Sequence, residues 1–195
     1  MNEKIAPHAN PAPHPDPLPA GGEREKTAPD LSKDLPLPRW IYTPGETAAP
    51  DDETLARAKS LVPPRFESFV PFDHPALVYG LALNDAGFFW ESHEILEAVW
   101  LAAPMGRRDR ILLRACIQIA NAGLKHRLGR VRAVERLLGE ARTELAELSV
   151  RAATPACPRS FAERLSYSSV AMVLSKDEGV GLPIAILGFL TLDSI

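Results

Sequence analysis

The residues best suited to chemistry lie in one short segment, Gly87 to Trp100, which reads GFFWESHEILEAVW. At about 100° per residue of a helix, His93, Glu94 and Glu97 fall on the side opposite the apolar residues. An imidazole beside carboxylates can transfer protons, hold a metal ion or join a buried polar network. Trp90 and Trp100 share this polar side, and each can bury a large apolar area. The pattern therefore predicts a covered helix whose polar groups line a pocket or a buried polar layer.

Three uses of this polar group remain open. His93 and Glu97 share a helix face and could bind a metal ion together. However, the sequence HEILE lacks the second histidine of the zinc-binding pattern H-E-x-x-H. Only the fold could bring His74 or His126 near. We therefore predict no metal ligand and no cofactor. General acid–base catalysis by His93 with Glu94 or Glu97 is one alternative. A structural network, or a pocket for a small molecule or a peptide, is the use that we favour.

A second helix, expected at about residues 107–128, carries a narrow polar stripe that includes several cations. The stripe either faces solvent or places Arg114, Gln118 and Lys125 opposite Glu94 and Glu97. Buried carboxylates need such partners, because an unpaired buried charge is strongly destabilising. The predicted ligand pocket or buried polar network consists of Glu91, His93, Glu94, Glu97, Trp90, Trp100, Arg114, Gln118 and Lys125.

Prolines, glycines and apolar spacing predict an all-α fold. Asp73 is the expected N-cap of a helix that runs through Leu83, and Gly129 is the expected C-terminal glycine of the cationic helix. The other predicted helices cover residues 51–62, 87–103, 130–148 and 161–174. The predicted organisation is a disordered proline-rich tail (1–38), an extended arm and short helix (39–72), a helical core domain (73–150), and a C-terminal helix with an irregular extension (151–195).

Composition narrows the class of protein. The chain has 195 residues, 46% of them hydrophobic, and a net charge of -3, which gives no argument for binding nucleic acid or a membrane surface. Eleven of the nineteen prolines lie within the first fifty residues, which explains the predicted tail. The first thirty residues lack an apolar stretch, and Cys116 and Cys157 are too few for a disulfide framework. We expect a cytoplasmic protein with a small-molecule or protein partner that is still unknown, no nucleic acid or membrane partner, and a homo-oligomer as an open option.

The motif resembles a known family. The chain resembles the bacterial and archaeal domain-of-unknown-function family 309, whose pattern is F-N-x-G-x-x-[WF]-E-x-H-E-x-x-E-x-x-W. The similar residues are Tyr79-Gly80, the segment Gly87 to Glu94, Glu97 and Trp100. The following Ile117-Gln118-Ile119-Ala120 resembles the next helix of that family, and the likeness extends over residues 39–148. It implies a compact bundle of about five helices, with the His93/Glu97 helix surrounded by the others. It implies no activity, and the chain departs from the pattern at Asn84-Asp85.

Two functions from different classes follow. We favour a non-enzymatic binding or interaction module with a polar His/Glu pocket. The alternative is a small enzyme that uses His93 with Glu94 or Glu97 as general acid and base, with or without a metal ion. Solvent exposure of His93 separates a ligand or substrate site from a sealed structural network.

Overall fold

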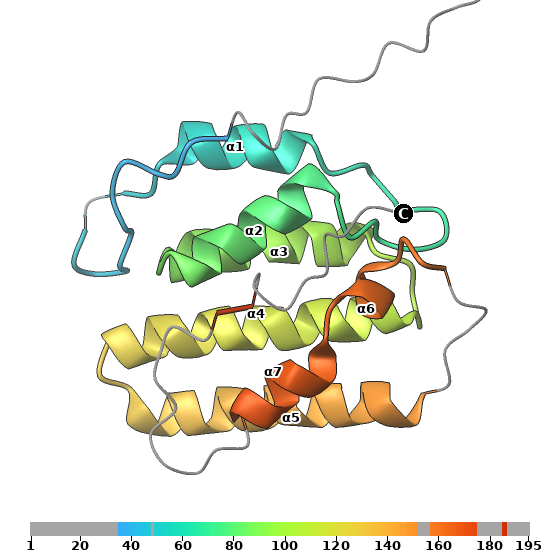
Figure 1. Cartoon of the computed structure of the whole chain (residues 1–195). Coiled ribbons are helices and arrows are strands. Elements are labelled where there is room, and N and C mark those ends of the chain that lie inside the picture. The colour runs from blue at the N-terminus through green and yellow to red at the C-terminus, as the bar shows by residue number, and fades with distance from the viewer. Residues whose placement is uncertain (1–34, 48, 152–156, 175–184, 187–195) are drawn as a thin grey trace, which may run out of the picture.

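The computed structural model describes residues 35–47, 49–151, 157–174 and 185–186. These residues form seven helices, which confirms the predicted all-α fold (Figure 1): α1 (Asp52–Ser60), α2 (Pro75–Asp85), α3 (Phe89–Ala102), α4 (Arg108–Arg127), α5 (Val131–Val150), α6 (Phe161–Arg164) and α7 (Tyr167–Leu174). Within this described part, no helix is long and apolar enough to cross a membrane. The predicted disorder of the proline-rich tail concerns residues that lie almost entirely outside the described ranges.

Helices α1 to α5 pack against one another in sequence order, and α3 lies in the middle of this stack. It contacts α1, α2 and α4, while α5 packs along α4 and α7 lies on α5 (Figure 1). Ile95, Leu96 and Val99 of α3 are completely buried in the core. This arrangement agrees with the expected position of the His93 helix among the others.

A glycine brings α2 and α3 close together. A Cβ atom on Gly80 would lie 2.8 Å from Cδ2 of Leu96, closer than such atoms approach in proteins. The Ser92 hydroxyl also donates a hydrogen bond of 2.8 Å to the Gly80 carbonyl. The Tyr79-Gly80 part of the motif therefore has a structural role, because it lets α3 approach α2.

The helix boundaries confirm some predictions and correct others. Gly129 follows α4 with a φ of 65°, and its amide donates to the His126 carbonyl, as expected for a C-terminal glycine. Asp73 is not an N-cap: His74 occupies that position, and Asp73 pairs with Arg159 at 3.1 Å. The prediction of Asp73 used only the local pattern, whereas its partner comes from a distant segment.

The helix expected at residues 161–174 is divided into two. Leu165 has extended backbone (ψ 126°), which ends α6. The carbonyl of Ser166 then accepts the amides of Ser169 and Val170, so α7 begins after it. Backbone hydrogen bonding therefore restarts within a segment whose apolar spacing suggested one continuous helix.

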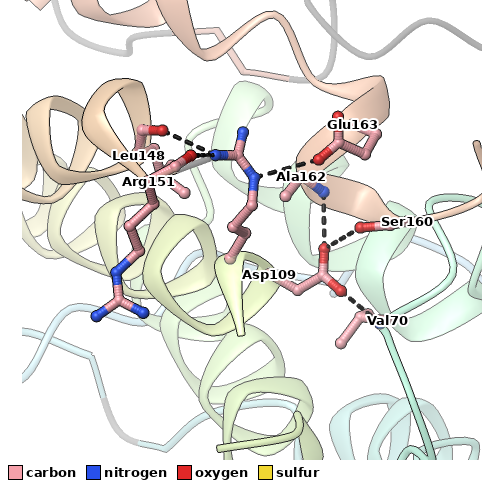
Figure 2. A network of polar contacts seen from close by, with 8 residues as sticks. Val70, Asp109, Leu148, Arg151, Ser160, Ala162 and Glu163 are labelled. Carbon is pink, nitrogen blue, oxygen red and sulfur yellow. Dashed lines mark hydrogen bonds and ion pairs between the residues drawn. The ribbon is translucent and has the colours of Figure 1, made fainter. Parts of the chain in front are cut away.

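A buried carboxylate ties the start of α4 to two other segments (Figure 2). Asp109 accepts hydrogen bonds from the Val70 amide (2.8 Å), the Ser160 hydroxyl (2.6 Å) and the Ala162 amide (2.8 Å). Its side chain is almost completely buried. An isolated antiparallel bridge between Pro71 and Ser160 lies beside this network. Asp109 thus joins α4, α6 and the segment before α2.

Candidate functional site

Three of the predicted site residues come together on one face of α3. His93, Glu94 and Glu97 each offer a ligand atom, and these three atoms lie within 4.8 Å of one another. Nε2 of His93 is 3.7 Å from Oε2 of Glu97, one helical turn away. The exposed fractions of the three side chains are 24%, 26% and 46% in sequence order. The cluster is therefore accessible from solvent and is not a sealed polar layer.

The cluster includes a cation from another helix. Nζ of Lys59, in the last turn of α1, lies 2.7 Å from Oε2 of Glu94. Lys59 is not among the residues predicted from the sequence, because it lies 35 residues before Glu94 and no local pattern connects the two. Among the described residues, Glu94 is thus the member of the cluster that already has a strong cationic partner.

Glu91 lies apart from the cluster, on a buried side of α3. Its side chain is completely buried, and Oε1 accepts a hydrogen bond of 2.8 Å from the Tyr42 amide. Burial raises the pKa of the Glu91 carboxyl, while the Tyr42 amide and the charge of Arg127 oppose that shift. Trp90 contacts the ring of Tyr42 edge to face, with ring centroids 4.8 Å apart. Both side chains therefore hold the arm that precedes α1.

Tyr79 provides another attachment for this arm. Its hydroxyl donates a hydrogen bond of 2.7 Å to the Pro36 carbonyl. Burial, together with the negative charges of Asp51 and Glu91, raises the pKa of Tyr79 to about 12. The hydroxyl therefore keeps its proton and remains a donor across the physiological pH range.

Trp100 occupies the last turn of α3. Like Trp90, it is partly buried and packs against the hydrophobic core. The guanidinium of Arg110 lies over the Trp100 ring, 3.9 Å from its centroid. The sequence pattern indicated that Trp100 is covered, but it did not identify Arg110 as part of the cover.

The alternative in which Arg114 and Gln118 pair with Glu94 and Glu97 is wrong. Arg114 forms an ion pair with Glu144, and Gln118 donates a hydrogen bond of 2.8 Å to Glu140. Because α4 and α5 lie side by side in opposite directions (Figure 1), residues spaced four apart on each helix meet in order. Arg114 and Gln118 face the acidic residues of α5, whereas Arg110 of the same stripe contacts Trp100 of α3.

Lys125 lies in the last turn of α4. Within the described residues, the ion pairs of Glu94 and Glu97 are with Lys59 and His93, so the predicted partnership with Lys125 is wrong. Arg127, also in the last turn of α4, donates a hydrogen bond of 2.8 Å to the Gly87 carbonyl. Within the described part of the chain, neither His74, at the start of α2, nor His126, at the end of α4, joins the cluster.

The donor set of the cluster defines what it can do. An imidazole nitrogen and two carboxylate oxygens on one helix face can coordinate a divalent cation. The same groups could exchange protons with a bound substrate, provided that a cavity encloses it. Five surface hollows of the described structure are lined by residues other than His93, Glu94 and Glu97. The donor set of the cluster is thus suited to binding an ion, which needs no enclosing cavity.

Comparison with known proteins agrees with the family resemblance. Residues 77–137 match the family described as "Domain of unknown function (DUF309)", and this segment contains all of α3 and α4. The resemblance seen in the sequence is confirmed over this segment, which includes the whole His93 cluster. No curated protein and no solved structure matches the chain. Since the family description names no activity, function has to be argued from the site itself.

Proposed function

We propose that this chain, whose residues 77–137 carry the DUF309 segment, is a non-enzymatic binding module that holds a divalent metal ion between His93, Glu94 and Glu97. The observation that carries the proposal is the convergence of three ligand atoms within 4.8 Å. Zinc–nitrogen and zinc–oxygen bonds are about 2.0–2.2 Å long, so two ligand atoms of one ion lie at most about 4.4 Å apart. The half-exposed Glu97 side chain has the rotational freedom to close the difference. The proposal replaces the sequence-based expectation of no metal ligand, which depended on the missing second histidine.

The ammonium of Lys59 competes with the metal ion in this proposal. Its position 2.7 Å from Oε2 of Glu94 gives that carboxylate a cation in the ion-free state. Metal binding then requires Glu94 to be shared or released, which weakens the apparent affinity. Removal of the Lys59 charge should therefore tighten metal binding, whereas removal of a ligand should weaken it. A change in net charge alone would produce the same two signs for Lys59 and for a glutamate ligand, so His93→Ala, which keeps every carboxylate, distinguishes a coordination site from nonspecific attraction to carboxylates.

A titration of the full chain tests the proposal. We expect one Co²⁺ ion to bind with visible absorption bands of a protein-coordinated ion, and Zn²⁺ to displace it. The variants His93→Ala and Glu97→Gln should weaken binding at least about tenfold, since even changes to groups behind metal ligands have effects of this size. Lys59→Met should strengthen it. His126→Ala, which changes an exposed histidine of α4, is the matched control. Equal affinity in His93→Ala and in the unchanged chain would refute the site.

The second candidate is a small enzyme that uses His93 with Glu97 or Glu94. The position of Glu97 one helical turn after His93, with Oε2 3.7 Å from Nε2, favours it, because a small side-chain rotation would bring the two groups within the distance needed for proton transfer. Under this alternative, the metal-free chain would hydrolyse simple aryl esters or phosphate esters faster than buffer does, because groups that coordinate a metal ion cannot also exchange protons. His93→Ala and Glu97→Gln would both abolish that excess rate. Under the binding proposal, the metal-free chain shows no excess rate.

A further inference from the structure

A hollow lined with arginines lies where α3 ends, α4 begins and α5 ends. Its volume is about 520 Å³, including space open to solvent. Four arginines and two glutamates line it, so positive charge exceeds negative: Arg107, Arg110, Arg114, Arg151, Glu144 and Glu147. The hollow shares no residue with the His93 cluster, so its chemistry does not depend on metal binding.

The two glutamates are already neutralised by two of the arginines. Arg114 forms its ion pair with Glu144, and Arg151 lies 2.8 Å from Glu147. Within the described part of the chain, Arg107 and Arg110 have no carboxylate partner. Two guanidinium groups therefore remain to attract an anion into the hollow.

Arg110 is held in a fixed position. Its Nη1 donates to the carbonyl of Trp100 (2.6 Å) and to that of Ala103 (2.9 Å), while the guanidinium plane covers the Trp100 ring. Both of these hydrogen bonds use the same nitrogen, so the remaining N–H groups can serve a ligand. Arg107, by contrast, is exposed at the N-cap of α4. Arg110 is thus a rigidly held donor, whereas the exposed side chain of Arg107 can adjust its position to a ligand.

A network beside the hollow ties Arg151, one of its lining residues, to the start of α4 (Figure 2). The side chain of Arg108 donates to the carbonyls of Leu148 (2.8 Å) and Arg151 and to the carboxylate of Glu163 (3.2 Å). These bonds tie the start of α4 to the end of α5. A preorganised wall lowers the entropy lost when a ligand binds.

The lining is also partly apolar. Trp100 and Ile111 are partly buried there, and Met105 is 74% exposed at the edge. An apolar group attached to an anion could lie on this surface, because exposed apolar area is favourable to cover. Guanidinium groups bind carboxylates and phosphates through paired hydrogen bonds, so the expected anion is one of these two kinds.

We propose that this hollow binds a small organic oxyanion, a carboxylate or a phosphate ester that bears an apolar group, and that Arg107 and Arg110 hold its charge. The proposal adds a second ligand site to the chain, at the C-terminal end of α3, whereas the His93 cluster lies in the middle of that helix. The two sites are separable by mutation because they share no side chain.

Chemical-shift titrations of the full ¹⁵N-labelled chain test the proposal. The probes are phenyl phosphate, benzoate and the uncharged benzyl alcohol. We expect at least one of the two anions to bind and to shift resonances of residues 105–111, while the alcohol does not. The anion that binds more tightly identifies the oxyanion for which the site is suited. His93→Ala should bind the anion as the unchanged chain does, so the outcome is independent of the metal proposal.

Arg107→Gln is the decisive variant, because Arg107 is exposed and its removal leaves the fold intact. It should raise the dissociation constant about tenfold, the usual effect of losing a hydrogen bond to a charged group. Arg65→Gln, which changes another exposed arginine before α2, should leave the constant unchanged. The proposal is wrong if neither anion binds, if benzyl alcohol binds equally well, or if Arg107→Gln and Arg65→Gln behave alike.

Discussion

Glu91 and Glu94 lie three positions apart on α3 and have different surroundings. Glu91 is completely buried and bonded to the backbone of the arm, whereas Glu94 is partly exposed and paired with Lys59. Removal of water penalises the charged form of a carboxylate, so the buried Glu91 is a structural group, whereas the partly exposed Glu94 remains available to a cation. The sequence pattern put both in one pocket, because periodicity gives the direction of a side chain but not what covers it.

Glu91→Gln should change the pH dependence of stability. Because burial raises the pKa of Glu91 above its ordinary value of 4.5, the folded chain binds this proton more tightly than the unfolded chain. The contribution is stabilising at low pH and is lost as pH rises from 4.5 through the folded-state pKa. Each tenfold difference in proton affinity between the folded and unfolded chains corresponds to about 1.4 kcal/mol. Glutamine keeps the acceptor for the Tyr42 amide and carries no charge.

Denaturant unfolding of both proteins between about pH 4 and pH 8 measures this effect. The stability of Glu91→Gln relative to the unchanged chain should increase as pH rises through that window. Parallel pH profiles would mean that Glu91 is not desolvated in solution.

Glu97→Ala should have little effect on folding. Its carboxylate is 46% exposed, and its contact with His93 is a surface pair, so the free energy of unfolding should fall by less than about 1 kcal/mol. A double-mutant cycle of Glu97 with Arg114 should give a coupling within about 0.3 kcal/mol of zero. The matched cycle of Glu144 with Arg114 should give about 1 kcal/mol, because those two side chains form the ion pair. Equal couplings in the two cycles would contradict the position of Arg114.

At the scale of elements, the sequence predicted which segments are helical better than it predicted what they face. Gly129 ends α4 as expected, since a left-handed C-terminal position favours glycine. The acidic partners of Arg114 and Gln118 could not be predicted, because they depend on α5 lying along α4. Lys59 was missed for the same reason: its contact with Glu94 exists only after α1 packs on α3.

Asp109→Ala tests how α4 is attached to α6 and to the segment before α2. The change leaves the Val70 amide, the Ser160 hydroxyl and the Ala162 amide buried without their acceptor. Each unsatisfied group destabilises by about 1–3 kcal/mol, so the free energy of unfolding should fall by about 3 kcal/mol or more. Asp73→Ala removes an exposed partner of nearby Arg159 and should cost less than about 1 kcal/mol. Similar values for the two variants, from denaturant titration, would show that the network does not hold these segments together.

At the scale of the whole molecule, α3 connects the arm before α1 with the two proposed ligand sites. Its first turns hold the arm through Trp90 and Glu91, its middle carries the His93 cluster, and its last turn supports the arginine hollow through Trp100. A central helix that contacts α1, α2 and α4 positions its polar groups more rigidly than a loop would. The motif in the sequence thus combines residues that pack, such as the completely buried Glu91, with the partly exposed His93, Glu94 and Glu97 of the proposed metal site.

The X-ray absorption spectrum of zinc bound to the full chain tests the central claim most directly. We expect a coordination shell of nitrogen and oxygen atoms at about 2.0–2.2 Å, with the multiple-scattering signal of one imidazole. The imidazole signal should disappear in His93→Ala and persist in His126→Ala. A coordination shell that contains sulfur, or an imidazole signal that persists without His93, would contradict a metal site made by His93, Glu94 and Glu97.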